Sequence, residues 1–217
     1  PHWNWVVERE IHDQFNCIVF HTAPLPYGRG GSPIQNLILE GLKESPVCAI
    51  KMTDKLDAGP IYASSNISLG GTLNSIFSRV NDAINDLMLD IIVENPNPVE
   101  QEGEPHIFKR LTNSDNEITA GLELEEVYDR IRMVDHADYP NAYIMYGDLK
   151  IEFTNAEDFR KKVETVKESY FNKKSTTGEQ IDDVAATDGD SVNEDLSTAM
   201  AAYSAAISKT KDIKLVS

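Results

Sequence analysis

The sequence has few cysteines, no long apolar run and a shortage of positive charge. Its 217 residues contain two cysteines, Cys17 and Cys48. Neither has the spacing of a metal site or of a disulfide framework, so both are interpreted as buried thiols and no metal site is predicted. No apolar stretch approaches the roughly 20 residues that a membrane-spanning helix needs, and the first residues do not resemble a signal peptide. We therefore expect a cytoplasmic protein without membrane contact.

Basic residues are outnumbered by acidic ones, 20 against 36, which gives a net charge of −16. Residues 179–195 carry seven acids and no base, and residues 196–217 add a net +2, so residues 1–178 still hold −11. Nucleic-acid-binding proteins usually carry a basic surface, because phosphate contacts supply much of their affinity. A tRNA partner is therefore disfavoured, although a local basic patch would escape this sum.

Strand and helix patterns alternate along the first hundred residues. Apolar periodicity and turn residues predict strands at 17–20, 47–52 and 61–69, and helices at 7–15, at 33–42 with Ser32 as the N-cap, and from 72 to 95. Such alternation favours an α/β sheet with parallel strands. Ligands of such sheets bind beyond the carboxyl ends of the strands, where His21 and the loop after it lie.

The rest of the chain divides into a short folded part and an acidic end. After a linker at 95–103, the patterns predict an apolar segment at 106–108, a helix at 122–133, a hairpin of 142–146 with 149–153, and a helix at 156–170. Beyond residue 174 the chain is polar, acidic and poor in aromatic residues, which predicts a disordered tail with a short alanine-rich helix near 196–207.

The loop FHTAPLPYGRGGSP, residues 20–33, is the first candidate site. His21 directly follows an apolar strand, prolines stiffen the loop, and glycines permit backbone conformations closed to other residues. Pro33 then begins a helix whose N-terminal amides face the same space. A rigid loop beside a titratable imidazole is a plausible reactive site, although a lone histidine at a strand end is more often structural.

The stretch FHTAPLPYGRGGSPIQNLILEG resembles the signature of the formyltransferase family, which includes methionyl-tRNA formyltransferase and the sugar N-formyltransferases. Members of the family place a Leu-Pro, an Arg-Gly and a Pro-Ile after the catalytic histidine, and their aspartate follows in a Leu-Asp-x-Gly turn. KMTDKLDAGPIY supplies that turn with Asp57 and Gly59. Gln101 and the run YPNAYIMYGDLKIEF resemble the family's passage to a C-terminal extension, so the resemblance covers residues 2–155.

The resemblance implies a Rossmann-like formyltransferase sheet with flanking helices, followed by a small α+β extension and the disordered acidic tail. Family members have several strands and helices before this point, so the chain is expected to lack the first part of the catalytic domain. Residues 1–112 would form the C-terminal portion of the catalytic domain, 113–155 a small subdomain, and 156–217 a helix with the tail.

The resemblance also implies transfer of a formyl group from 10-formyltetrahydrofolate to a primary amine. His21 would donate to the oxyanion and relay a proton, with Asp57 as its partner. The acidic composition favours a small amine such as a nucleotide-linked amino sugar, while methionyl-tRNA stays an alternative. Arg29 would either pair with Asp57 or contact an anionic acceptor. By their match to the family's motif, the residues expected to contact substrate or formyl donor are Pro24, Leu25, Pro26, Arg29, Gly30, Pro33 and Gly59.

One position departs from the family's pattern, because Val19 stands where members carry an asparagine two residues before the histidine. Losing one oxyanion donor costs on the order of 10²–10³ in turnover. Strand periodicity puts Asn16 on the opposite face from His21, so either Asn4 or a loop amide replaces the donor, or the enzyme is weak. The alternatives are a folate- or nucleotide-binding module with weakened catalysis and a formyltetrahydrofolate hydrolase. The sequence gives no oligomeric state.

Overall fold

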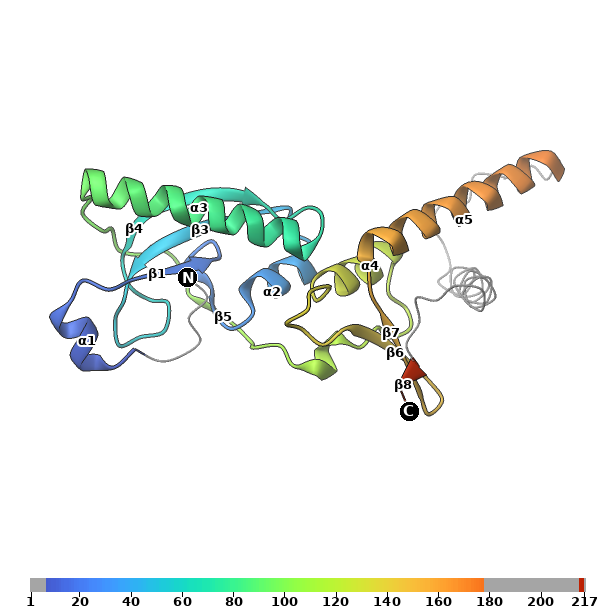
Figure 1. Cartoon of the computed structure of the whole chain (residues 1–217), viewed down its shortest axis with the longest axis horizontal. Helices are drawn as coiled ribbons and strands as arrows, with labels where there is room; N and C mark the ends of the chain where they lie inside the picture. Colours follow the sequence, from blue (N-terminus) through green and yellow to red (C-terminus); the bar gives the residue numbers. More distant parts are fainter. Residues whose placement is uncertain (1–6, 178–214, 217) are drawn as a thin grey trace. The chain divides into compact units, whose positions relative to one another are not determined.

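A computed structural model describes residues 7–177 and 215–216 of the chain (Figure 1). Its contacts divide the chain into two units, Pro1–Asp115 with His136–Tyr139, and Asn116–Asp135 with Pro140–Ser217. Among the described helices, none is long and apolar enough to cross a membrane. The predictions made for Asn4, for a helix near 196–207 and for most of the acidic tail fall outside the described residues.

The first unit is built around a three-stranded sheet in the order β1-β3-β4, and both of its strand pairs are antiparallel. Its strands are β1 (Ile18–Thr22), β3 (Glu44–Lys51) and β4 (Ile61–Ser68), and the helix α1 (Arg9–Gln14) precedes them. His21 in β1 lies opposite Cys48 in β3. This register puts both side chains on one face of the sheet.

The prediction of parallel strands in this sheet was wrong. The loop after His21 contains a strand that the sequence patterns did not identify, β2 (Tyr27–Gly30), which pairs in parallel with β5 (His106–Phe108). The chain therefore leaves the first sheet after β1 and returns in β3 with its direction reversed. β4 then follows β3 through the turn at 52–60 as in a hairpin, so it is antiparallel as well.

Two helices cover this unit, α2 (Pro33–Leu39) and α3 (Leu73–Glu94). α3 packs along β3 and β4 (Figure 1) and begins after Thr72, whose Oγ1 accepts a hydrogen bond from the Ser75 amide at 3.2 Å. Ser32 does not cap α2 with its side chain as predicted; its Oγ accepts from the Leu111 amide at 3.1 Å. Side chains less than 2% exposed form the core of this unit: Leu37, Ile38, Val47, Ile50, Leu69, Leu73 and Ile76.

The second unit contains a β-hairpin and two helices. Its elements are α4 (Leu124–Arg132), β6 (Ala142–Tyr146), β7 (Leu149–Phe153), α5 (Ala156–Thr177) and β8 (Leu215–Val216), and the 3-10 helix η1 (Asn113–Asn116) lies where the two units meet along the chain. The hairpin has the predicted ends. α5 continues to Thr177, past its predicted end at residue 170, and β8 pairs with β7.

Candidate active site

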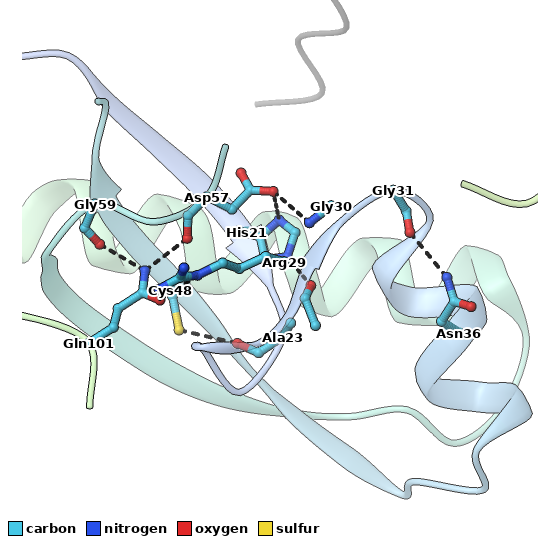
Figure 2. Close-up of polar contacts among 11 residues, drawn as sticks. His21, Ala23, Arg29, Gly30, Gly31, Asn36, Cys48, Asp57, Gly59 and Gln101 are labelled. Carbon is cyan, nitrogen blue, oxygen red and sulfur yellow. Dashed lines mark hydrogen bonds and ion pairs between the residues drawn. The ribbon is translucent and has the colours of Figure 1, made fainter. Parts of the chain in front are cut away.

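His21, the second-last residue of β1, is buried, with 7% of its surface exposed. Its Nε2 donates a hydrogen bond to the Gly28 carbonyl oxygen at 2.7 Å; Nε2 carries the proton because a carbonyl oxygen can only accept. Its Nδ1 lies 3.5 Å from Asp57 Oδ2 (Figure 2). The ring is therefore held between a backbone carbonyl of β2 on one side and a carboxylate on the other.

Asp57 lies in the turn between β3 and β4, and this turn brings its carboxylate to β1. Its φ is +49°, a left-handed conformation that aspartate tolerates better than most residues. The side chain is 12% exposed, and its Oδ2 accepts a hydrogen bond from the Gly30 amide at 2.9 Å. The structure thus brings together His21 and Asp57, the two residues expected to carry the chemistry, and one Asp57 oxygen faces both His21 and β2.

Gly59 lets the turn lie directly against the end of β3. A Cβ placed on Gly59 would lie 1.7 Å from the Lys51 carbonyl oxygen, far inside contact distance. The neighbouring Lys51 amide donates to the Pro60 carbonyl at 2.9 Å. Any side chain at this position would push the turn, and Asp57 with it, away from β3.

Of the two contacts considered for Arg29 from the sequence, the structure tests the pairing with the Asp57 carboxylate, and Arg29 contacts Gln101 instead. Its Nε and one terminal nitrogen donate to Gln101 Oε1, at 3.0 and 2.7 Å. Gln101 Nε2 in turn donates to the carbonyl oxygens of Asp57 and Gly59, both at 2.8 Å. Arg29 is therefore connected to the backbone of the Asp57 turn through Gln101, and not to the Asp57 carboxylate.

The proline-rich loop is fixed by backbone contacts. The peptide bond between Leu25 and Pro26 is cis, the Tyr27 amide donates to the Pro24 carbonyl at 3.1 Å, and the His106 amide donates to the Pro26 carbonyl at 3.2 Å. Pro24 and Leu25 are half-buried. Pro33 is the first residue of α2, as predicted.

Val19 stands where family members carry an asparagine, and several nearby polar groups already make hydrogen bonds of their own. Val19 pairs with Ile50 in the sheet and offers no hydrogen-bond donor from its side chain. Asn16 Oδ1 accepts from the Tyr62 hydroxyl at 2.7 Å. Of the loop amides, Gly30 donates to Asp57 and Gly31 donates to the Phe108 carbonyl at 3.3 Å.

Cys48 lies beside this site as a neutral group. It is buried, its Sγ donates to the Ala23 carbonyl at 3.4 Å, and burial raises the pKa of its thiol to about 11. This confirms the interpretation of Cys48 as a buried thiol, whereas Cys17 is only half-buried. Within residues 7–177 and 215–216, no group of three or more His, Cys, Asp or Glu side chains is arranged to hold a metal ion.

The sequence is similar to known formyltransferases. Residues 113–166 match the family described as methionyl-tRNA formyltransferase, C-terminal domain. The methionyl-tRNA formyltransferase of Malacoplasma penetrans is 28% identical over 150 residues, which cover 66% of this chain and 46% of that protein. The Rickettsia massiliae enzyme is 27% identical over 149 residues, which cover 66% of this chain and 49% of that protein. The chain thus spans about half the length of the curated relatives it matches.

Solved structures with the same fold include a closer relative. Methionyl-tRNA formyltransferase from Clostridium thermocellum superposes with a TM-score of 0.69 at 42% identity, covering 71% of this chain and 69% of that one. A 4-N formyltransferase from Francisella tularensis superposes with a TM-score of 0.61 at 19% identity, covering 71% and 67%, which bears on the fold alone. The α/β formyltransferase fold expected from the sequence is confirmed, and the chain belongs to the formyltransferase family.

Proposed function

We propose that the protein is an N-formyltransferase that moves a formyl group from 10-formyltetrahydrofolate to a primary amine, with His21 and Asp57 at the reacting centre. The observation that carries this proposal is the contact of 3.5 Å between Nδ1 of the buried His21 and Oδ2 of Asp57, whose side chain is 12% exposed, in a chain of the formyltransferase family. Contacts between catalytic groups are commonly long without substrate and tighten in the Michaelis complex.

The reaction makes two demands that this pair fits. When the amine nitrogen attacks the formyl carbon, a new C–N bond forms and the carbonyl oxygen becomes an oxyanion, which needs a hydrogen-bond donor. The attacking nitrogen must also lose a proton. In the proposed mechanism His21 carries a proton on both ring nitrogens: Nε2 stays on the Gly28 carbonyl, and the Nδ1–H donates to the oxyanion. The Asp57 carboxylate beside Nδ1 accepts the amine proton. Breaking the C–N bond to the donor then releases tetrahydrofolate, whose departing nitrogen takes up that proton.

The formyl donor is proposed from the family resemblance. HypX from Aquifex aeolicus, which shares the fold at 15% identity, has been solved in complex with tetrahydrofolic acid. In this chain Pro24 and Leu25 offer half-buried apolar surface in the loop that follows His21, which suits a flat aromatic ring. We propose that this loop, through Pro26, Arg29 and Gly30, together with Pro33 and Gly59, borders the donor and the acceptor.

The acceptor is proposed to be a small amine, such as a nucleotide-linked amino sugar. The segment that matches the C-terminal domain of methionyl-tRNA formyltransferase, residues 113–166, carries thirteen acidic and six basic residues, a net charge of −7. Such a charge opposes a polyanionic acceptor. Methionyl-tRNA is the second candidate, favoured by the 42% identity with the Clostridium thermocellum enzyme.

The test is a formyl-transfer assay on the complete gene product, with 10-formyltetrahydrofolate and a panel of amino-sugar nucleotides and methionyl-tRNA. His21→Ala and Asp57→Asn should each lower turnover by roughly 10²–10⁴-fold. Asp82→Asn, which changes an exposed carboxylate on α3, is the matched control and should leave turnover unchanged.

Each result of this assay has a distinct meaning. Wild-type turnover in both site variants would refute the roles of His21 and Asp57. Release of formate without any acceptor would identify the hydrolase instead. No reaction with any acceptor, in a folded protein that binds folate, would favour the binding module.

A further inference from the structure

We propose that Gln101 is a positioning residue that holds the Asp57 turn at its working distance from His21. The role assigned to Gln101 rests on the function proposed above for Asp57. Gln101 belongs to the linker after α3 and touches neither His21 nor the Asp57 carboxylate through any described hydrogen bond. It acts on Asp57 through the backbone.

Every hydrogen-bonding position of the Gln101 amide is filled. A primary amide has two N–H donors and two oxygen lone pairs. In Gln101 both donors meet carbonyl oxygens of the turn, those of Asp57 and Gly59, and the oxygen accepts twice from Arg29. A flipped amide would set its oxygen against two carbonyls and its NH₂ against a guanidinium. The partners therefore allow a single orientation of this half-buried side chain.

Two separate connections tie the Asp57 turn to β2. In the first, the Gly30 amide holds the Asp57 carboxylate at 2.9 Å. In the second, Gln101 links the turn's carbonyls to Arg29, the residue before Gly30 (Figure 2). The His21 ring is bonded to Gly28 of the same strand. Because His21 and the Asp57 turn are both hydrogen-bonded to β2, a turn that moves away from β2 also moves Asp57 away from His21.

Gln101 is itself fixed on both sides along the chain. Two residues before it, Val99 forms a backbone bridge with Ile61 of β4, with hydrogen bonds of 2.7 and 2.8 Å. Five residues after it, the His106 amide of β5 donates to the Pro26 carbonyl at 3.2 Å. An amide anchored in this way can hold a turn in place, whereas one on a free loop would move with it.

The test replaces Gln101 with methionine, which has a similar length but makes no comparable hydrogen bonds. In the complete gene product, Gln101→Met should lower kcat by roughly 10–100-fold, because a displacement near 1 Å is enough for such a loss, while KM for donor and acceptor stays within about twofold. Gln14→Met, at the exposed end of α1, is the matched control and should behave as wild type.

Amide hydrogen exchange tests the same role without activity. The Gly30 amide donates to the Asp57 carboxylate, whereas the neighbouring Gly31 amide donates to Phe108 of β5. Gln101→Met should speed exchange at Gly30 by roughly tenfold, as expected for loss of one hydrogen bond, and leave Gly31 unchanged. Equal acceleration at both amides would mean general loosening and would overturn the assignment.

The Asp57→Asn background separates this proposal from the proposed function. If Gln101 acts through Asp57, adding Gln101→Met to Asp57→Asn should cause little further loss of kcat, whereas independent effects would multiply. An Asp57→Asn variant with wild-type turnover would refute the proposed function. Hydrogen exchange at the Gly30 amide in the Gln101→Met variant would still test whether Gln101 holds the Asp57 turn in place. A Gln101→Met variant with normal kcat and normal Gly30 exchange would overturn the present proposal.

A second variant covers the case in which Gln101→Met does not fold. Gln101→Glu keeps an acceptor for Arg29 and sets a carboxylate oxygen against the carbonyls of Asp57 and Gly59. It should therefore preserve the Arg29 contact and release the turn, with the same selective change at the Gly30 amide. Normal exchange at Gly30 in this variant would also count against the proposal.

Discussion

Replacing Gly59 by alanine tests whether close packing of the turn on β3 sets the position of Asp57. The added Cβ would lie 1.7 Å from the Lys51 carbonyl oxygen and 2.9 Å from its carbon. Since a carbon and an oxygen in contact stay about 3.3 Å apart, the turn and β3 would have to separate by roughly 1.6 Å. Both neighbours are backbone, so no side chain can move aside.

The magnitude follows from this displacement. Overpacking of a tight contact costs about 1–3 kcal/mol of folding free energy. The Gly59 carbonyl accepts from Gln101, so the same shift weakens the hold on Asp57, and a loss of roughly 10² in turnover is expected. Gly70→Ala is the matched control, because neither glycine has a positive φ and a Cβ on Gly70 would meet only the movable Ser68 hydroxyl, at 3.3 Å.

Two measurements are made on both variants and the wild type: urea denaturation gives the free energy of unfolding, and a separate formyl-transfer assay on the folded proteins gives turnover. For Gly59→Ala the denaturation midpoint should fall by roughly 1 M at an unchanged slope, whereas Gly70→Ala should stay close to wild type. If Gly59→Ala unfolds within about 0.5 kcal/mol of Gly70→Ala, the ordinary range for a surface substitution, the steric reasoning is refuted.

Three further results are expected. Val19→Asn should raise formyl transfer by about 10², measured as turnover; a folded variant with no gain would favour the binding module. Cys48 should resist a thiol reagent at pH 8 in the folded protein and react in urea, because burial raises its pKa to about 11; native labelling at Cys48 rather than Cys17 would contradict this. Hydrogen bonding from Lys109 lowers the pKa of Asp115 to about 2. The ionised Asp115 carboxylate therefore contributes to the stability of the folded protein above pH 4, and this contribution is lost as pH falls toward 2. Lys109→Met should raise that pKa in a carbon-13 NMR titration, and an unchanged value would rule out the lysine as its cause.

Elements with local signals could be predicted from the sequence. The hairpin of β6 and β7 has its predicted ends because alternating apolar residues flank Gly147, whose φ is +58°, and such a turn fixes the register. α3 begins after Thr72 and ends before Asn95, which has a φ of +46°. In both cases the residues that decide the structure are neighbours in the chain.

Features that depend on distant partners could not be predicted in this way. Periodicity identified β1, β3 and β4 but not their directions, and β2 was missed because its partner β5 lies far along the chain. Its Gly- and Pro-rich sequence is also poor in strand-forming residues. The family resemblance drew attention to Asp57 as a partner for His21. It gave no indication that Arg29 pairs with Gln101, 72 residues away.

The distance along the chain between Gln101 and the turn it holds affects when the site is completed during synthesis. Asp57 and Gln101 are 44 residues apart, which a ribosome adding about 5–20 residues per second covers in roughly 2–9 s. During that interval a nascent chain carries both His21 and Asp57, but not the amide that fixes the turn between them. Formation of the sheet would therefore precede catalytic competence, and a product that terminates within α3 would present both reactive side chains without their working geometry.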